Sequence, residues 1–381
     1  MIRLASVIDT FGTDFLTQYR GSLTADHLRA LAAIKRCRTQ ASVQMQVQCS
    51  GCSHHARIPH SCGHRHCPHC QHHESQQWLE RQIQKQVPAE YFLLTFTLPA
   101  ELRRMAGAHP ATVYDLLLRC SWETVRTFSQ NDKQLQGAPG AIAVLHTNTR
   151  QLEFHPHVHL VMPAAAVDAK NKRWRTKGGM NRHKVKGGYL FNHKALAKVF
   201  RAKLLAGITA AGLVLPERYP TDWVVDCKSV GTGAAALIYL GRYLYRGVIR
   251  EKDIVACAQG QVTFRYRDAK TGKMMRRTLP GAQFLWLVLQ HVLPKGFRRA
   301  RNFGFLHPNC KRLIALVQVL LKVVLPATAS RIKARASIVC PCCGAVMVIV
   351  RTRIRQPNLP MPTGTVSIPI APAVTGVSSL M

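Results

Sequence analysis

The stretch His155-Pro156-His157-Val158-His159-Leu160-Val161 decides how the middle of this chain folds. After the proline, histidines alternate with apolar residues, and a period of two is typical of a β-strand with one face in a core. The strand is expected to span Phe154–Met162. A second apolar run, Ala141–His146, comes before it, and the polar residues 147–151 separate the two runs. Together the two runs predict an antiparallel β-hairpin.

The histidines of this hairpin form a candidate metal site. Side chains two residues apart on a strand point to the same face, so His157 and His159 project together. His146 lies 11 residues before His157, and the hairpin would bring it beside the pair as a third ligand, with Glu153 as a weaker candidate. Such a site leaves coordination positions open for a divalent ion that also binds substrate oxygens. A structural or solvated histidine pair is the alternative.

Further strand and helix patterns surround the hairpin. Strands are expected at Tyr91–Leu98, Trp223–Cys227, Val262–Arg267 and Lys273–Thr278, and helices at Ala111–Phe128, His193–Ala211 and Ala234–Tyr245. The order strand, helix, hairpin, helix, strand, helix predicts an α+β fold in which helices flank an antiparallel sheet.

Composition changes along the chain and suggests four regions. Residues 24–88 are rich in cysteine and histidine and are expected to form a small metal-held domain. Residues 89–310 would form the α+β domain, and residues 311–355 a helical region that ends in a second group of cysteines. Residues 356–381 are rich in Pro, Thr, Ser and Val without a helical period, which predicts a disordered tail.

The predicted helix at 234–245 carries candidate catalytic and DNA-binding residues. Tyr239 and Tyr243 are four residues apart and would stand one above the other on a helix. Arg242 and Arg246 form a second such pair, suited to binding phosphates. A tyrosine with a pKa near about 10 needs nearby charge and good geometry to act as a nucleophile. An aromatic stripe that packs into the core is the alternative, and Tyr245 fits that alternative better.

Two CxxC pairs in the first region predict a zinc site. Cys49 and Cys52 are followed, after 14 intervening residues, by Cys67 and Cys70, and two such turns supply the four thiolates of a tetrahedral Zn²⁺. Additional donors leave open a substituted ligand or a second partial site; they are Cys37, Cys62, His66 and His69.

A third CxxC pair stands near the other end of the chain. Cys340-Pro341-Cys342-Cys343-Gly344 resembles half of a zinc site, and no second pair follows it. It could complete a site with a distant thiol such as Cys310, join two chains, or be a remnant without metal.

The charge of the chain points to a polyanionic partner. The 381 residues include 53 Lys+Arg and 18 Asp+Glu, a formal net charge of +35, while 47% of the residues are hydrophobic. This composition predicts a globular protein that binds nucleic acid rather than membrane. The sequence contains no apolar run long enough to span a bilayer and no signal-peptide pattern. Its 13 cysteines are therefore expected in the reducing cytoplasm.

The order of these motifs resembles that of the two-tyrosine rolling-circle transposases of the bacterial insertion sequence ninety-one family. His157-Val158-His159 is similar to the histidine–hydrophobic–histidine (HUH) motif of rolling-circle nucleases, and Tyr239-Leu240-Gly241-Arg242-Tyr243 is similar to their paired nucleophiles. The resemblance spans about residues 25–310 and is also carried by Cys37-Arg38-Thr39, Ser61–Cys70, Phe96–Pro99, Leu145–Thr147, Val262–Tyr266 and His291–Phe297. The chain departs from the family at Ala164-Ala165-Ala166, where a glycine-rich turn is usual.

The resemblance implies an HUH nuclease core with a ferredoxin-like antiparallel sheet, joined to an N-terminal zinc-binding domain. It implies an enzyme that cleaves single-stranded DNA at transposon ends with Mg²⁺ or Mn²⁺, leaving a 5′-phosphotyrosine and a free 3′-OH. Tyr239 and Tyr243 would be the catalytic residues, and His157, His159 and His146 the ligands of this metal.

Two other functions remain open from the sequence. A plasmid replication initiator or relaxase would use the same chemistry, and a zinc-finger DNA-binding protein would use none. The sequence contains no GxxxxGK[ST] motif of a helicase, so strand separation is expected to depend on host helicase and replication machinery.

Overall fold

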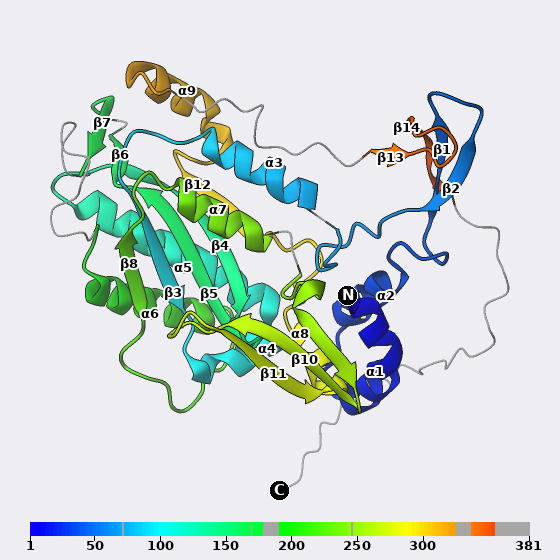
Figure 1. Cartoon of the computed structure of the whole chain (residues 1–381). Coiled ribbons are helices and arrows are strands. Elements are labelled where there is room, and N and C mark those ends of the chain that lie inside the picture. The colour runs from blue at the N-terminus through cyan, green and yellow to red at the C-terminus, as the bar shows by residue number, and fades with distance from the viewer. Residues whose placement is uncertain (71, 169, 178–189, 245–246, 325–336, 355–381) are drawn as a thin grey trace, which may run out of the picture. The chain divides into compact units, whose positions relative to one another are not determined.

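The computed structural model describes the chain except for residues 71, 169, 178–189, 245–246, 325–336 and 355–381 (Figure 1). The chain divides into two compact units. The large unit comprises Met1–Arg38 and Ser61–Ala336, and the small unit comprises Thr39–His60 and Ser337–Met381. The predicted disordered tail, residues 356–381, lies outside the described residues.

An antiparallel sheet forms the centre of the large unit (Figure 1). Its strand order is β7-β6-β4-β5-β3-β8, and β12 also pairs with β4. The strands are β3 (Tyr91–Thr97), β4 (Ala138–Asn148), β5 (Phe154–Pro163), β6 (Ala165–Asp168), β7 (Arg173–Thr176), β8 (Val225–Ser229) and β12 (Ala300–Gly304). The predicted hairpin is confirmed, because β4 and β5 pair antiparallel with His146 opposite His157.

Alternate residues of the sheet face two different cores. On β3, Phe92, Leu94 and Phe96 belong to one core, whereas Tyr91 and Leu93 belong to the other. The first core is closed by helices α4 (Arg103–Ala108), α5 (Pro110–Asn131) and α6 (His193–Ala210). The second is closed by α3 (His72–Ile83), α7 (Ala234–Leu244) and α9 (Lys311–Leu320). Helices on both faces of an antiparallel sheet confirm the predicted α+β fold.

A third core joins the N-terminal helices to a small sheet. Its elements are α1 (Leu4–Gln18), α2 (Ala25–Arg36), α8 (Gly281–Leu289), β9 (Ile254–Ala258), β10 (Gln261–Arg267) and β11 (Met274–Pro280). The predicted second hairpin is confirmed as the pair β10–β11. Short 3₁₀ helices complete the unit: η1 (Arg20–Ser22), η2 (Ala100–Leu102), η3 (Glu251–Asp253) and η4 (Pro308–Cys310).

The small unit is one antiparallel sheet of order β13-β14-β1-β2. Its strands are β1 (Gln44–Cys49), β2 (His55–Pro59), β13 (Ile338–Val339) and β14 (Val346–Ile354). The structure thus divides the chain at points other than the predicted boundaries. The predicted region 24–88 is split between the two units, as is the region 311–355. The physical reason is the long-range pairing of β1 with β14, for which the sequence pattern contains no local signal.

Acid is expected to destabilise the large unit through its buried histidines, of which His291 offers a clean test. Burial lowers the pKa of His291 to about 4, whereas a histidine in the unfolded chain has a pKa of about 6.5. Its contribution to stability is therefore complete above pH 6.5 and is lost as the pH falls toward 4. The ring donates from Nε2 to the Leu152 carbonyl at 2.9 Å, and His291→Gln keeps a donor there without a titrating group. Between pH 7 and pH 5 the wild type should lose about 2 kcal/mol more than the variant in urea unfolding, and equal losses would contradict the assignment.

Candidate active site and cysteine clusters

Three histidines meet on the face of the central sheet that α7 covers. On β5, Val158 and Leu160 face the core closed by α5 and α6, so His157 and His159 face the opposite side, the side of Val161. The register of the hairpin places His146 of β4 directly across from His157. The alternation of the strand therefore determines which core receives the histidines, as the sequence pattern indicated.

The three imidazoles are close enough to share one ion. Ring centroids are 5.3 Å apart for His146 and His157, 4.5 Å for His146 and His159, and 4.8 Å for His157 and His159. One nitrogen from each ring lies within 4.8 Å of the others. The structure thus brings together all three residues that the sequence suggested as ligands of a divalent metal.

Neighbouring groups orient two of these rings. The Nδ1 atom of His157 donates to the backbone carbonyl of His155 at 2.6 Å, and Nδ1 of His159 lies 3.0 Å from the hydroxyl of Thr95 on β3. A hydrogen bond on one ring nitrogen leaves the other nitrogen available to a metal. Thr95 was missed from the sequence, since only the antiparallel register of β3 and β5 reveals that it lies opposite His159.

The histidines are neutral at physiological pH. Burial is the main cause and lowers the pKa of His157 to about 4 and that of His159 to about 3, while the pKa of His146 falls well below its ordinary value. Each ring also disfavours a second positive charge on its neighbours. Neutral imidazole is the form that coordinates a metal, so the site is held in the binding-competent state.

Tyr239 of α7 lies beside this cluster. Its ring centroid is 6.3 Å from that of His146 and 6.1 Å from that of His159, and its side chain is 38% exposed. Tyr243 and Arg242 belong to the same helix, but their side chains, like the whole of Arg246, lie outside the described residues. Tyr239 is therefore the predicted nucleophile whose position the structure describes.

The cluster opens into a cleft of about 560 Å³. His146, His157 and Tyr239 form one side of it. The other side comes from the turn after β4, from residues 247–253 and from β10, and it contributes cationic side chains: Arg150, Arg250, Arg265 and Arg267. These arginines were not singled out from the sequence, because β10 reaches the cleft only through tertiary packing. A basic cleft beside a tyrosine suits a phosphate-containing substrate.

A first cluster of cysteines lies within the large unit. It consists of Cys37, Cys62, Cys67 and Cys70, whose sulfur atoms lie within 4.8 Å of one another. Cys70 Sγ is 3.7 Å from Cys37 Sγ and 3.6 Å from Cys62 Sγ. Hydrogen bonds from the neighbouring thiols, that of Cys37 first, hold the pKa of Cys70 well below its ordinary value. The cluster thus favours a thiolate at Cys70, the form that binds metal, whereas hydrogen bonds with Cys37 raise the pKa values of Cys62 and Cys67.

A second cluster lies within the small unit and corrects the predicted grouping. It consists of Cys49, Cys52, Cys340 and Cys343, so the pairs Cys49/Cys52 and Cys67/Cys70 do not share one site. Each pair is completed by other cysteines instead. The spacing of CxxC turns identified the pairs correctly, but it could not show which pairs meet, because partners here are up to 294 positions apart.

Two family models match the chain. One, described as "Putative transposase", covers residues 140–313, and the other, described as "Transposase zinc-binding domain", covers residues 7–98. The chain is also 31% identical over 326 residues to "Putative transposase y4qJ" of Sinorhizobium fredii, a match that covers 80% of each protein. The chain is an IS91-family transposase.

The transposase is also similar to a second curated relative and to solved structures of a conjugative relaxase. It is 26% identical over 298 residues to "Transposase for insertion sequence element IS801" of Pseudomonas savastanoi pv. phaseolicola, covering 72% of the transposase and 68% of that protein. The conjugative relaxase TrwC in complex with mutant oriT DNA has 16% identity and a TM-score of 0.24, covering 60% of the transposase and 71% of that chain. Metal-bound TrwC with oriT DNA has 14% identity and a TM-score of 0.26, covering 62% and 74%.

Membership of this family settles the class of activity. The transposase is a DNA-cleaving enzyme of transposition, and it carries a zinc-binding domain. Within the described part of its chain, no helix is both long and apolar enough to cross a membrane.

Thr95 is expected to tune the metal affinity of the transposase without binding the metal itself. Thr95→Val keeps the shape of the side chain but removes the hydroxyl that lies 3.0 Å from His159 Nδ1. Loss of such a partner typically weakens metal binding by about 10–100-fold. Calorimetric titration with Mn²⁺ should show this loss, and Thr95→Ser should restore the wild-type affinity. An unchanged affinity in Thr95→Val would remove Thr95 from the site.

Proposed function

We propose that the transposase cleaves single-stranded DNA at the ends of its insertion sequence with Tyr239 as the attacking residue. The phenolic oxygen forms a bond to the scissile phosphorus and releases its proton to solvent, while the bond to the 3′ oxygen breaks. The 3′ oxygen takes up a proton and leaves as a free 3′-OH, and the 5′ phosphate stays on the tyrosine. The same linkage conserves the energy needed for strand transfer, in which a 3′-OH displaces Tyr239.

One observation carries this proposal: the Tyr239 ring lies within 6.3 Å of two histidines of a three-histidine cluster, at the edge of a basic cleft. A phosphate bound between the cluster and the tyrosine would meet both the nucleophile and the metal ligands. Tyr243, one helical turn further along α7, remains the predicted second nucleophile for the other strand-transfer step.

We propose that His146, His157 and His159 hold a divalent ion, Mg²⁺ or Mn²⁺, for this reaction. When bound, such an ion draws charge from the scissile phosphate and thereby stabilises the transition state. The protein supplies three neutral donors on a rigid sheet and leaves the remaining positions to substrate oxygens.

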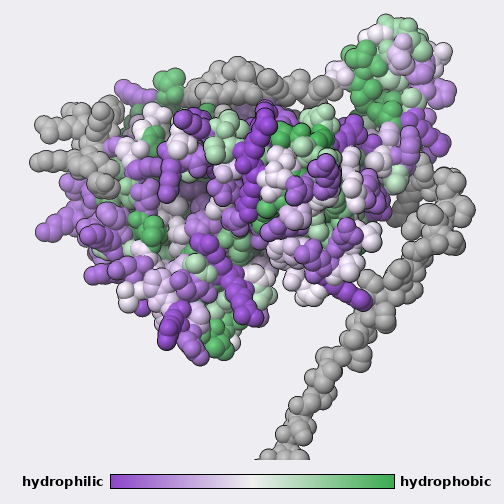
Figure 2. Space-filling model, turned by 60° about the horizontal axis from the view of Figure 1, so that its bottom comes forward, coloured by the Kyte–Doolittle hydropathy of each residue, from purple (hydrophilic) through white to green (hydrophobic). Residues whose placement is uncertain are grey.

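Contacts with the DNA backbone are proposed to come from the arginines of the cleft and from α7. Arg265 donates to Asp253 at 3.2 Å, and Arg250 donates to the same carboxylate at 2.5 Å, so Asp253 orients two cations at the rim of the cleft. Arg242 and Arg246 remain predicted phosphate ligands. Figure 2 shows hydrophilic residues spread over the displayed face, in keeping with a net charge of +35 and a largely electrostatic mode of DNA binding.

We further propose that Cys37, Cys62, Cys67 and Cys70 hold the structural zinc ion of the large unit. Three of the four thiols are buried, and their sulfur–sulfur distances of 3.6–3.7 Å match the edge of a zinc–thiolate tetrahedron, about 3.8 Å for Zn–S bonds of about 2.3 Å. The cluster lies between α2 and α3 in the chain, and the N–H of His64 donates to Cys62 Sγ at 3.4 Å.

The reaction would take place in the cytoplasm, where the thiols stay reduced. Host helicase and replication machinery would expose the single strand, since this chain has no helicase motif.

A cleavage assay tests the proposed function. Labelled single-stranded DNA from the ends of the element is incubated with the protein in Mn²⁺ or in EDTA and analysed on denaturing gels. A labelled band that migrates with the protein only in Mn²⁺ would support a covalent intermediate. DNA binding without any adduct on either end would instead favour the non-catalytic DNA-binding alternative.

A further inference from the structure

We infer that the transposase binds a second zinc ion, held by Cys49, Cys52, Cys340 and Cys343 in the small unit. Cys340 and Cys343 lie outside both stretches that match the family models, residues 7–98 and 140–313. Half of the site therefore lies outside the matched zinc-binding domain, and the site joins two segments that are almost 300 residues apart.

The sulfur geometry fits a single tetrahedral ion. Sγ of Cys49 is 3.4 Å from Sγ of Cys343, and Sγ of Cys52 is 3.8 Å from that of Cys340 and 3.6 Å from that of Cys343. A tetrahedron with Zn–S bonds of about 2.3 Å has edges of about 3.8 Å. These distances exceed a disulfide bond of about 2.05 Å by a wide margin, and all four cysteines are free.

The backbone around the cysteines is shaped for close packing about an ion. The N–H of Gly51 points at Cys49 Sγ at 3.3 Å, a hydrogen bond that stabilises a thiolate. A Cβ atom on Gly51 would lie 2.9 Å from Cβ of Ala345, so only glycine lets the two CxxC turns approach this closely. Gly344 has φ +74, a conformation that glycine adopts without strain, and its N–H donates to the Cys340 carbonyl at 3.0 Å, which closes the turn.

The small unit has too little core to be stable by apolar burial alone. Its buried apolar cluster consists of Val47, Cys49, Cys340 and Met347, so two of the four members are themselves ligands. On β14, Val348 is 57% exposed and Val350 is 59% exposed. A sheet with this little burial requires another source of folding energy, which a bound zinc ion supplies.

Zinc content of the full-length protein tests the inference, with Cys342→Ser as the matched control. Cys342 sits in the same turn but outside the cluster. By elemental analysis and native mass spectrometry, the wild type and Cys342→Ser should contain two zinc ions per chain. The double variant Cys340→Ser/Cys343→Ser should contain one, the ion of the large unit. Equal zinc contents in the wild type and the double variant would overturn the inference.

A second variant covers the case in which the double variant fails to fold. Cys340→His offers a nitrogen ligand in place of a thiolate, so it should keep two ions. After exchange with Co²⁺, the absorption of its Co–thiolate bonds should be weaker than that of the wild type, because one of the eight Co–S bonds is replaced by a bond to nitrogen. An unchanged Co²⁺ spectrum would show that Cys340 is not a ligand. Neither measurement involves DNA cleavage, so the result is independent of the proposed nuclease activity.

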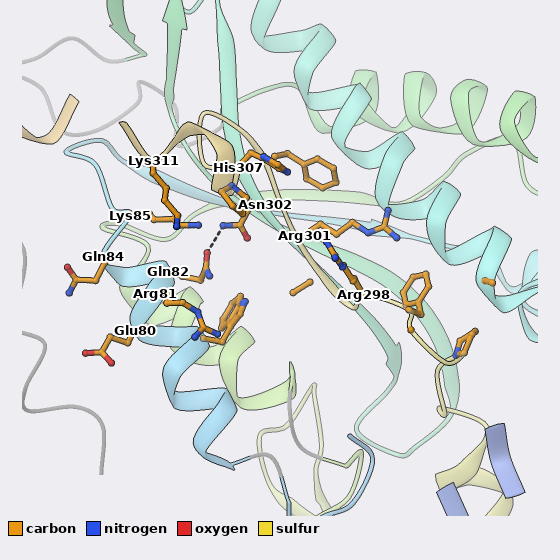
Figure 3. Close-up of a pocket in the computed structure, with 18 of the residues that line it drawn as sticks. Glu80, Arg81, Gln82, Gln84, Lys85, Arg298, Arg301, Asn302, His307 and Lys311 are labelled. Carbon is orange, nitrogen blue, oxygen red and sulfur yellow. Dashed lines mark hydrogen bonds between the residues drawn. The ribbon is translucent and has the colours of Figure 1, made fainter. Parts of the chain in front are cut away.

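The geometry also points to a DNA-binding groove on the large unit, apart from the histidine cleft; this proposal rests on the proposed action on single-stranded DNA. The groove has a volume of about 1310 Å³ and is formed by the end of α3, the loop 294–299, β12 and the start of α9. Figure 3 shows Arg81 and Lys85 on one side of it and Arg298 and Arg301 on the other. We propose that it binds the phosphate backbone of a single DNA strand.

Uncompensated charge supports this groove. Arg81, Arg298 and Lys311 line it, are exposed, and form no ion pair with a carboxylate in the part of the chain that the structure describes. Lys85 is half-buried between them, and its pKa is lowered by burial and by the like charges of Lys311 and Arg81. Phosphate groups would relieve this repulsion. The ring of Phe297, over which Arg301 lies at 5.5 Å, adds an aromatic surface on which bases could stack.

The salt dependence of DNA binding tests the groove. The variant Arg81→Gln/Arg298→Gln/Lys311→Gln should lower the slope of log K against log salt by about 2 for an oligo-dT probe, because each phosphate contact contributes about 0.7. The control is Lys133→Gln/Lys194→Gln/Lys198→Gln, which removes the same charge from exposed positions that do not line the groove. Binding is measured in EDTA, so cleavage plays no part. A slope that changes equally in both variants would overturn the proposal.

Discussion

Tyr239→Phe should lower the rate of DNA cleavage by roughly 10³-fold or more and abolish the covalent protein–DNA adduct. The substitution removes one oxygen atom from a ring that is 38% exposed, so neither folding nor the cleft should change. What disappears is the only atom of this side chain that can attack phosphorus. The measurement is adduct formation in Mn²⁺ under single-turnover conditions, followed on denaturing gels with DNA labelled on the 5′-phosphate side of the cut.

Two further variants make the result specific. Tyr219→Phe removes a phenolic oxygen from a tyrosine that packs under Arg201, outside the cleft, and should leave adduct formation unchanged. Tyr243→Phe should keep the first cleavage and impair the later strand-transfer step. If Tyr239→Phe cleaves as fast as the wild type while Tyr243→Phe does not, the roles of the two tyrosines are reversed and Tyr239 is not the first nucleophile.

The histidine site could be predicted from the sequence because its geometry is local. A strand fixes which side chains share a face, and a short turn fixes which residues of the hairpin lie opposite each other. Both rules act within the stretch 141–162, so His146, His157 and His159 could be placed together before any tertiary packing was known. Thr95 could not be found in this way, because it lies 64 residues before His159 and meets it only through the pairing of β3 with β5.

The cysteine clusters show where sequence reasoning stops. A CxxC turn is a local structure, so each pair was recognisable, but the partner of each pair is set by long-range pairing. Cys49 and Cys52 meet Cys340 and Cys343 because β1 pairs with β14, and no feature of either strand specifies this register from the sequence alone. The same limit explains the domain boundaries, which were drawn along the chain, whereas the small unit is built from two separated segments.

Strand β12 was also missed, and for a different reason. Its sequence Ala-Arg-Asn-Phe-Gly has neither the alternation nor the β-branched residues that mark a strand. It is a strand because β4 offers it a free edge from Gly140 to Val144, so tertiary context overrides a weak local preference.

The double variant His157→Ala/His159→Ala should abolish metal-dependent cleavage and lower the affinity for Mn²⁺ by roughly 10³-fold. Two of three imidazoles would be lost, and a single buried imidazole is a weak ligand. Mn²⁺ binding is measured directly, by the electron paramagnetic resonance signal of the free ion during titration. The control is His109→Ala, an exposed histidine before α5 that lies outside the cluster and should change neither binding nor cleavage.

Comparison of this variant with Tyr239→Phe separates the metal from the nucleophile. If the cluster only supports the fold, the double histidine variant should lose stability, and Mn²⁺ should bind the wild type no better than the variant. If the cluster is the metal site, Tyr239→Phe should bind Mn²⁺ with wild-type affinity yet form no adduct, while the histidine variant loses both.

Because burial already keeps these rings neutral, with the pKa of His157 at about 4 and that of His159 at about 3, the Mn²⁺ affinity of the wild type should stay nearly constant from pH 8 down to pH 5. A steep loss of affinity near pH 6.5, as for solvent-exposed histidines, would mean that the ion binds elsewhere.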